Sequence, residues 1–375
     1  MTMRLSRHDT EWLRAVLRLG LETPRSGDGA AVAGGPRNQS AIGAWCRTHR
    51  ATAIVAAGMS AAGCSVPDEW NDVAAAGQFA QLQAAHELAE ISAVLAAASV
   101  DHCCFKGLAV AQYYPQPALR RAGVDADILV TPSRARDAAL ALFDAGWQDR
   151  NSDEVRAQIF KRFYQLELQP AEGGELALDL HWNIDHAELP SSPSAAGIIE
   201  RRQRAQLAGV GVPVPEPADH LHLCVIHAAK NGCARWWLLA DIAMLLKEVD
   251  ADSWQRVWAC DPLRPALARC LVLAEHWCGA ALTTAQRADV DPWRHRISKE
   301  LAGLDRRLRR CRFAPDENRV ERQWYLRSLP RQRDRARVLL TPSPEDFALV
   351  PNLPRMLWPL LRPVRLVVKY LRRGW

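Results

Sequence analysis

The chain has 375 residues, of which 49% are hydrophobic and 24% charged, so it is long enough to bury a large core in two or three subdomains. It contains no run of about 20 apolar residues, which excludes an obvious membrane-spanning helix. The net charge of +6 is uneven, because residues 301–375 hold 18 Lys and Arg against 7 Asp and Glu.

The ten cysteines form no CxxC pair, so their spacing argues against a zinc site. Charges are spread through the first 20 residues, which lack the apolar core of a signal peptide. Free cysteines and the missing signal together predict a reduced, cytoplasmic compartment.

Residues 1–100 form a predicted N-terminal helical region. An amphipathic helix is expected within residues 1–20, and one helix over 40–59 after a Gly- and Pro-rich loop at 27–36. A longer helix is expected over residues 72–99.

Residues 101–190 predict an α/β core. A strand before Lys106-Gly107 leads into a helix that should stop near Pro115, and a second strand is expected over 124–130. A helix over 135–147 follows. The alternating segments 163–170 and 175–183, with Gly-Gly between them, predict a β-hairpin.

Asp125 and Asp127 lie two apart in the predicted strand, so both side chains should point to the same face. Two adjacent carboxylates repel each other unless a cation lies between them. Mg²⁺ meets that need, since it binds one or two carboxylates together with substrate phosphates. The alternative is a pair of solvated aspartates on an exposed strand, because the Asp-x-Asp tripeptide is common.

A third carboxylate, Asp179, lies in the second strand of the hairpin. Leu176, Leu178 and Leu180 share one face of that strand, whereas Asp179 and His181 share the other. Asp179 could complete a metal site or help to deprotonate an acceptor hydroxyl. His181 could contact a phosphate, although a packed, hydrogen-bonded histidine is the simpler interpretation.

Four residues near the aspartates could bind phosphate. Lys106 and Gly107 precede a helix, where glycine allows close backbone approach. Arg120 and Arg121 come just before Asp125 and could bind a triphosphate bidentately.

Residues 191–300 predict a connector with one short helix, ended by Pro213, and then a helical domain. Asp241 lies in the apolar helix WWLLADIAMLLKEV and needs a partner, which Lys230 or His227 could provide. A helix–helix salt bridge is one interpretation. The other places Lys230 at the phosphates of a nucleotide.

Residues 301–375 predict a basic helical C-terminal region. Within residues 345–375, apolar side chains alternate with Arg and Lys, which is compatible with peripheral contact at the inner face of a membrane or with packing onto the core. The region has no recognisable motif for reading nucleic acid, so a nucleic-acid partner is not expected.

The order KG…Y…LR…DxDhLV, then hDLHW, then HxxK…hhxDhxxLL resembles an uncharacterised bacterial nucleotidyltransferase family, where h is hydrophobic. This family belongs to the DNA-polymerase-β-like nucleotidyltransferase superfamily, and the resemblance extends from about residue 80 to the end. It implies an α+β fold with a mixed sheet, flanked by an N-terminal helical region and a C-terminal helical domain. The wider superfamily usually has Gly-Ser at the phosphate-binding turn, where this chain has Lys106-Gly107.

The resemblance implies an enzyme that transfers a nucleoside monophosphate from an Mg²⁺-bound nucleoside triphosphate (NTP) to a hydroxyl or phosphate acceptor on a small molecule, peptide or protein, in a biosynthetic pathway. In this interpretation Asp125, Asp127 and Asp179 hold the metal and carry catalysis. The nucleotide would contact a set of basic and turn residues: Lys106, Gly107, Arg120, Arg121, His181 and Lys230. The alternative is a non-catalytic accessory protein that binds a nucleotide or a partner on the same fold.

Overall fold

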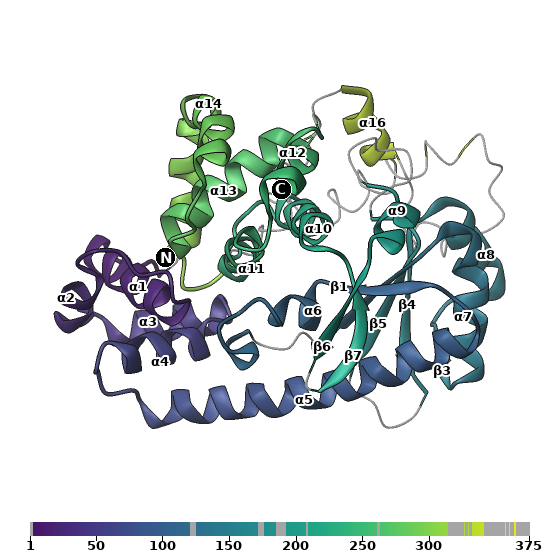
Figure 1. The fold of residues 1–375 in the computed structure, drawn as a ribbon, viewed down its shortest axis with the longest axis horizontal. Helices are drawn as coiled ribbons and strands as arrows, with labels where there is room; N and C mark the ends of the chain where they lie inside the picture. Colours follow the sequence, from purple (N-terminus) through teal and green to yellow (C-terminus); the bar gives the residue numbers. More distant parts are fainter. Residues whose placement is uncertain are drawn as a thin grey trace.

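A computed structural model describes residues 3–120, 125–171, 176–184, 193–207, 209–260, 263–313 and 332–340, with five single positions between 326 and 364. The fold is α+β, with a mixed five-stranded sheet flanked by helices before and after it in the chain, as the sequence predicts (Figure 1).

The sheet has the strand order β1-β2-β5-β4-β3. Only the β2–β5 pair is parallel, and the other three pairs are antiparallel. The predicted hairpin is confirmed, because β4 and β5 pair directly. The strands are β1 (His102–Phe105), β2 (Asp125–Val130), β3 (Trp147–Gln148), β4 (Gln165–Pro170) and β5 (Ala177–His181).

One face of the sheet packs on the helices α5 (Asp68–Ala97), α7 (Ala135–Asp144) and α8 (Asp153–Arg162). Ala126, Ile128 and the leucines at even positions of β4 and β5 point into this core. On the opposite face, β1 and β2 contact α9 (Ala195–Glu200) and α10 (Pro217–Lys230). The alternation of side chains in β2 therefore buries Ala126 and Ile128 and directs Asp125 and Asp127 to the other face.

A second core is formed by helices that precede the sheet and helices that follow it in the chain. Trp45 of α3 stacks with Trp277 of α13 at 5.9 Å between ring centroids and meets Trp236 of α11 edge to face at the same distance. The N-terminal helices in this core are α1 (Arg7–Gly20), α3 (Gln39–Thr48) and α4 (Thr52–Ala61), with α2 (Asp28–Ala33) packed beside α1. The later helices are α10, α11 (Trp236–Leu246), α12 (Ala251–Trp258), α13 (Arg264–Cys278) and α14 (Thr284–Leu308).

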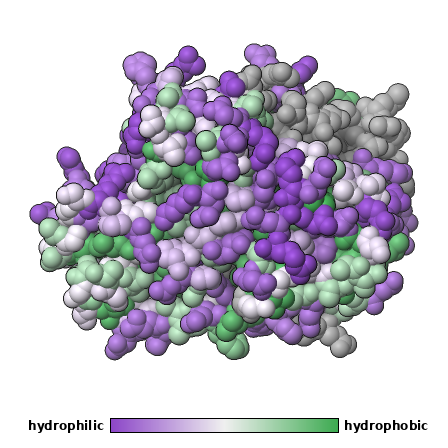
Figure 2. All heavy atoms as spheres, viewed as in Figure 1, coloured by the Kyte–Doolittle hydropathy of each residue, from purple (hydrophilic) through white to green (hydrophobic). Residues whose placement is uncertain are grey.

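The 30-residue helix α5 connects the two cores along the lower edge of Figure 1. Trp70 near its start belongs to the all-helical core, whereas Leu88 and Leu95 belong to the core under the sheet. Figure 2 shows a largely hydrophilic face with hydrophobic spots in its lower part. The remaining described helix is α16 (Gln332–Leu340).

Two sequence predictions are wrong in the helical parts. The single helix expected over 40–59 is divided into α3 and α4, because Arg50 adopts a left-handed conformation with φ of +52°. Residues 191–215 are more than a connector, since α9 is followed by a hairpin of β6 (Gln203–Leu207) and β7 (Val210–Val214).

The prediction of a connector is wrong because Pro213 indicates irregular structure in the sequence. Pro213 lies inside β7, and a two-stranded ribbon tolerates the missing N–H. Ala205, Leu207 and Val212 pack on the core beneath the sheet, which stabilises the hairpin. Pro217 begins α10, and Glu216 occupies the N-cap position of this helix.

None of the described helices combines the length and apolarity needed to cross a bilayer. The predicted membrane contact of residues 345–375 falls almost wholly outside the described residues, and no observation supports it.

Candidate active site

The Asp-x-Asp strand lies in the middle of three adjacent strands. In the register, Asp127 pairs with Phe105 of β1 on one side and with Asp179 of β5 on the other. Glu167 of β4 follows Asp179 in the same row. The predicted approach of Asp179 to Asp127 is therefore confirmed, and three acidic side chains lie in one row across the sheet.

Asp127 is buried and accepts two hydrogen bonds. The Nζ of Lys106 lies 2.7 Å from its Oδ1, and the Nε2 of His181 lies 3.0 Å from the same oxygen. Burial alone would raise the pKa of Asp127, but the Lys106 charge and the His181 hydrogen bond hold it well below its usual range. Burial lowers the pKa of His181 to about 4, so this imidazole is neutral at pH 7.

At Asp179, nearby groups do not offset the effect of burial on the pKa as they do at Asp127. Burial raises its pKa to about 7, and the negative charges of Asp127 and Glu167 act in the same direction. The pKa of Asp125 is also raised, first by burial and then by Asp127. Within this row, one lysine is hydrogen-bonded to one of several carboxylates, so negative charge exceeds positive charge.

The donor set fits a divalent cation. Asp127, Asp179 and His181 each have a ligand atom within 4.8 Å of the others, and Asp125 lies on the same strand face as Asp127. Carboxylate oxygens are the ligands of Mg²⁺ and Mn²⁺, and imidazole suits several transition metals. Burial is the main cause of the raised pKa of Asp179, the neighbouring carboxylates add to it, and a bound cation would favour the ionised form.

The Lys106-Gly107 turn follows β1 and begins α6 (Gly107–Ala111), as the sequence predicts. Lys106 has φ of +58°, a conformation that favours glycine, and Gly107 has φ of +43°. The backbone N–H of Lys106 donates to Nε2 of His220 in α10 at 3.1 Å, so a helix of the other core supports the turn. Backbone strain of this kind often accompanies functional sites.

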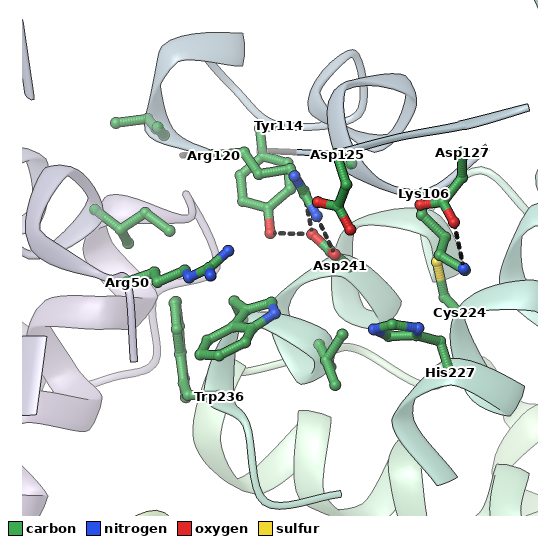
Figure 3. Close-up of a pocket in the computed structure, with 15 residues that line it drawn as sticks. Arg50, Lys106, Tyr114, Arg120, Asp125, Asp127, Cys224, His227, Trp236 and Asp241 are labelled. Atoms are coloured by element: carbon green, nitrogen blue, oxygen red, sulfur yellow. Dashed lines mark hydrogen bonds and ion pairs between the residues drawn. The ribbon is translucent and has the colours of Figure 1, made fainter. Parts of the chain in front are cut away.

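A cavity of about 230 Å³ opens beside Asp125 and Asp127 (Figure 3). It lies between the sheet, the N-terminal helices and α10–α11. Three cationic and three acidic side chains contribute to its wall, together with apolar and aromatic residues. The charged ones are Arg50, Lys106, Arg120, Asp125, Asp127 and Asp241.

Arg120 lines this cavity but is bound to Asp241. Its Nε and a terminal nitrogen lie 2.7 and 2.8 Å from the two carboxylate oxygens, and the Tyr114 hydroxyl donates to the same carboxylate at 2.8 Å. The partner predicted for Asp241, Lys230 or His227, is therefore wrong. The sequence carried no signal for the correct pair, because 121 positions separate Arg120 from Asp241.

Lys230 lies elsewhere. Its Nζ donates to the carbonyl of Ile184 at 3.3 Å and lies 4.7 Å from the centre of the Tyr164 ring. His227 lines the cavity, and burial lowers its pKa to about 3. Arg121 lies outside the described residues.

The residues of the cavity wall that the sequence does not identify include Arg50, Tyr114 and Trp237. Arg50 precedes Lys106 by more than 50 positions in a segment interpreted as an ordinary helix. Tyr114 was interpreted only as a helix end. A positive charge at the end of a short helix is common, so no local pattern identifies Arg50.

Comparison with protein-family models gives a match over residues 35–279 to a family described as "Uncharacterised nucleotidyltransferase". Among solved structures, the chain is similar to the antibiotic-resistance factor ANT(2'')-Ia, whose solution structure is described as revealing substrate-regulated conformation dynamics. That similarity has 15% identity and a TM-score of 0.35, and covers 53% of this chain and 97% of the other. A search of curated proteins gives no match.

Proposed function

The chain belongs to the family of uncharacterised nucleotidyltransferases, and from this premise we propose that it transfers a nucleoside monophosphate from a metal-bound NTP to a hydroxyl or phosphate group of an acceptor. The observation that carries the proposal is the row of carboxylates across β2 and β5, beside an open cavity. Such a row is costly unless a cation occupies it.

Asp125, Asp127 and Asp179 would hold the divalent cation, which we propose is Mg²⁺. When bound, this ion would offset the negative charge on the phosphates. His181 donates to Asp127 and would orient that carboxylate, as outer hydrogen bonds do at many metal sites. The Lys106 ammonium and the backbone at Gly107 would contact the phosphates from the opposite edge of β2.

The acceptor oxygen would attack the α-phosphorus in line with the leaving pyrophosphate. The new bond joins the acceptor oxygen to phosphorus, the α–β bridging P–O bond breaks, and pyrophosphate leaves with the electron pair. A carboxylate oxygen of Asp179 that does not bind the cation would take the acceptor's proton, because Asp179 lies beside Asp127 in the row.

Arg120 lines the cavity, and its pairing with Asp241 fixes where its charge lies. Because Asp241 balances this charge, a nucleotide contact by Arg120 stays a prediction from the sequence. Nucleotide contacts by Arg121 and Lys230 stay predictions from the sequence.

The ion pair between Lys106 and Asp127 favours a second candidate, a non-catalytic protein that binds a nucleotide or a partner on this fold. In that case the lysine would replace the cation permanently.

Isothermal titration separates the two candidates. Each of the four NTPs is titrated into wild type and into the Asp125→Asn/Asp127→Asn double variant, with and without Mg²⁺. Asp137→Asn, a partly exposed residue of α7 paired with Arg134, is the control. We expect Mg²⁺-dependent binding that the double variant loses and the control keeps. Absence of NTP binding by folded wild type at millimolar ligand would contradict the proposal.

A further inference from the structure

Arg50 brings a positive charge from the N-terminal helices into the wall of the active-site cavity. We infer that this side chain binds the β- and γ-phosphates of the NTP, that is, the pyrophosphate that leaves. The inference rests on the proposed function and adds one element to it: the N-terminal helices supply part of the substrate site. Arg50 and Lys106 approach the cavity from opposite walls (Figure 3).

The backbone at Arg50 shows that this placement has a conformational cost. α3 ends at Thr48 and α4 begins at Thr52, and Arg50 between them has φ of +52°. Glycine is the usual residue in a left-handed position at the end of a helix. Here an arginine occupies it, and the same strain occurs at Lys106 on the facing wall. Glu22, Ser99 and Cys233 have a similar φ after other helices, and what distinguishes Arg50 and Lys106 is that both line the cavity.

An aromatic ring holds the guanidinium at the cavity. The Cζ of Arg50 lies 5.0 Å from the centre of the Trp237 ring, and both residues line the cavity. A cation–π contact of this kind stabilises the charged side chain at the cavity, where a guanidinium can bind two phosphate oxygens at once.

The acceptor and the leaving pyrophosphate need separate places at the carboxylate row. Asp179, the proposed proton acceptor, is next to Asp127 on β5 and is not among the residues that line the cavity. The acceptor would therefore approach Asp127 from β5, outside the cavity, which leaves the cavity to the nucleotide. Figure 3 shows Arg50 beyond Asp125, on the side away from Asp127, so a chain of phosphates that starts at the carboxylates and enters the cavity can reach Arg50.

The charges around the cavity agree with this assignment. Lys106 is within hydrogen-bond distance of Asp127, and Arg120 of Asp241. The Arg50 charge acts on Asp125, where it opposes the pKa increase that burial and Asp127 cause. A polyphosphate entering between Arg50 and Asp125 would thus meet a cation on one side and a metal-binding carboxylate on the other.

Titration calorimetry with inorganic tripolyphosphate tests the inference without knowledge of the base. The Mg²⁺ complex of tripolyphosphate is titrated into wild type, Arg50→Met and Arg50→Lys. The NTP that wild type binds most tightly, and the corresponding monophosphate, are titrated in parallel. Arg47→Met is the matched control, because Arg47 is exposed on α3 and is not among the lining residues.

We expect Arg50→Met to weaken binding of tripolyphosphate and the NTP by about 10- to 100-fold, the range for losing charge-assisted hydrogen bonds. Binding of the monophosphate should change less than about twofold. Arg50→Lys should give an intermediate loss, because the charge remains but the bidentate fork is absent. Arg50→Lys also tests the inference if Arg50→Met does not fold.

The outcomes distinguish this inference from the proposed function. If wild type binds an NTP with Mg²⁺ and Arg50→Met binds tripolyphosphate as tightly as wild type, Arg50 is not a phosphate ligand and the proposed function survives. Equal weakening of the triphosphate and monophosphate would also overturn the inference. If folded wild type binds neither tripolyphosphate nor any NTP, both fail together.

Discussion

Two buried carboxylates near the same cavity have opposite surroundings. Asp241 of α11 is 2% exposed and receives a bidentate Arg120 guanidinium and the Tyr114 hydroxyl. Asp127 of β2 is 7% exposed, and Lys106 and His181 share a single oxygen of it while Asp179 lies alongside. The first group is electrically balanced by its own residues. In the second group Lys106 is hydrogen-bonded to Asp127, whereas the pKa values of Asp125 and Asp179 are both raised.

The two carboxylates show how a charge buried for stability differs from one buried for function. A buried ion pair with every atom satisfied needs no further ligand and fixes how two elements meet. In this protein it attaches the segment before β2 to α11. A partly buried row of like charges is retained at a cost, and such perturbed groups concentrate at functional sites. The same cavity wall therefore contains a structural cluster and a candidate metal site.

The largest expected effect is on the balanced cluster. Asp241→Ala leaves the Arg120 guanidinium buried without its carboxylate, so we expect unfolding free energy to fall by about 3–5 kcal/mol in urea titrations. The Arg120→Met/Asp241→Leu double variant removes both charges and should recover most of that loss. A double variant as unstable as Asp241→Ala would show that burial of unpaired charge is not the cause.

At the carboxylate row, removal of one charge should raise the unfolding free energy. Asp179→Asn removes a repelling charge, so in metal-free buffer at pH 8 we expect it to raise the unfolding free energy by about 1–3 kcal/mol. The folded pKa of Asp179 is about 7 against 3.8 for the unfolded chain. The contribution of Asp179 to wild-type stability is therefore largest below the lower value and is lost as pH rises through this window.

Urea titrations at pH 5 and pH 8 with chelator check whether Asp179→Asn stabilises the protein. The advantage of Asp179→Asn should be less than about half as large at pH 5, where the folded wild type still keeps the proton. Glu167→Gln, an exposed neighbour opposite Asp179, is the matched control and should change stability by less than about 1 kcal/mol. Destabilisation by Asp179→Asn at pH 8 would contradict an excess of negative charge at the row.

The smallest expected effect concerns Tyr114. Tyr114→Phe removes one hydrogen bond to Asp241 while the Arg120 pair remains, so we expect a loss of about 1–2 kcal/mol in unfolding free energy. Affinity for an NTP should not change by more than about twofold, since the charges around the cavity are unaltered. A large loss of affinity with intact stability would move Tyr114 from the structural cluster to the substrate site.

Local patterns in the sequence predicted the sheet and its acids well. The two-residue period places Asp125 and Asp127 on one face of β2, and the leucines of β5 point away from Asp179. The two-residue alternation of side chains does not determine which strands are neighbours in the sheet. The approach of Asp179 to Asp127 therefore depended on the resemblance to a family, and the β2–β5 pairing confirmed it.

The sequence did not predict contacts between distant segments. The partner of Asp241 was sought within its own helical domain, although the structure provides Arg120 from the segment before β2. Arg50 enters the cavity because α3 and α4 share a core with α11 and α13, and that packing leaves no local pattern around Arg50. The β6–β7 hairpin was missed because Pro213 suggested irregular structure, yet a ribbon of two strands accepts it.

Binding of Mn²⁺ to the carboxylate row tests the central claim most directly, through the electron paramagnetic resonance signal of the free ion. The titration is made with wild type, Asp127→Asn and the control Asp137→Asn, each with and without the NTP that wild type binds. We expect wild type and the control to reduce the free Mn²⁺ signal, more strongly with the NTP present, and Asp127→Asn to leave it nearly unchanged. Equal binding by Asp127→Asn and wild type, or no binding by wild type, would contradict a metal–nucleotide site at this row.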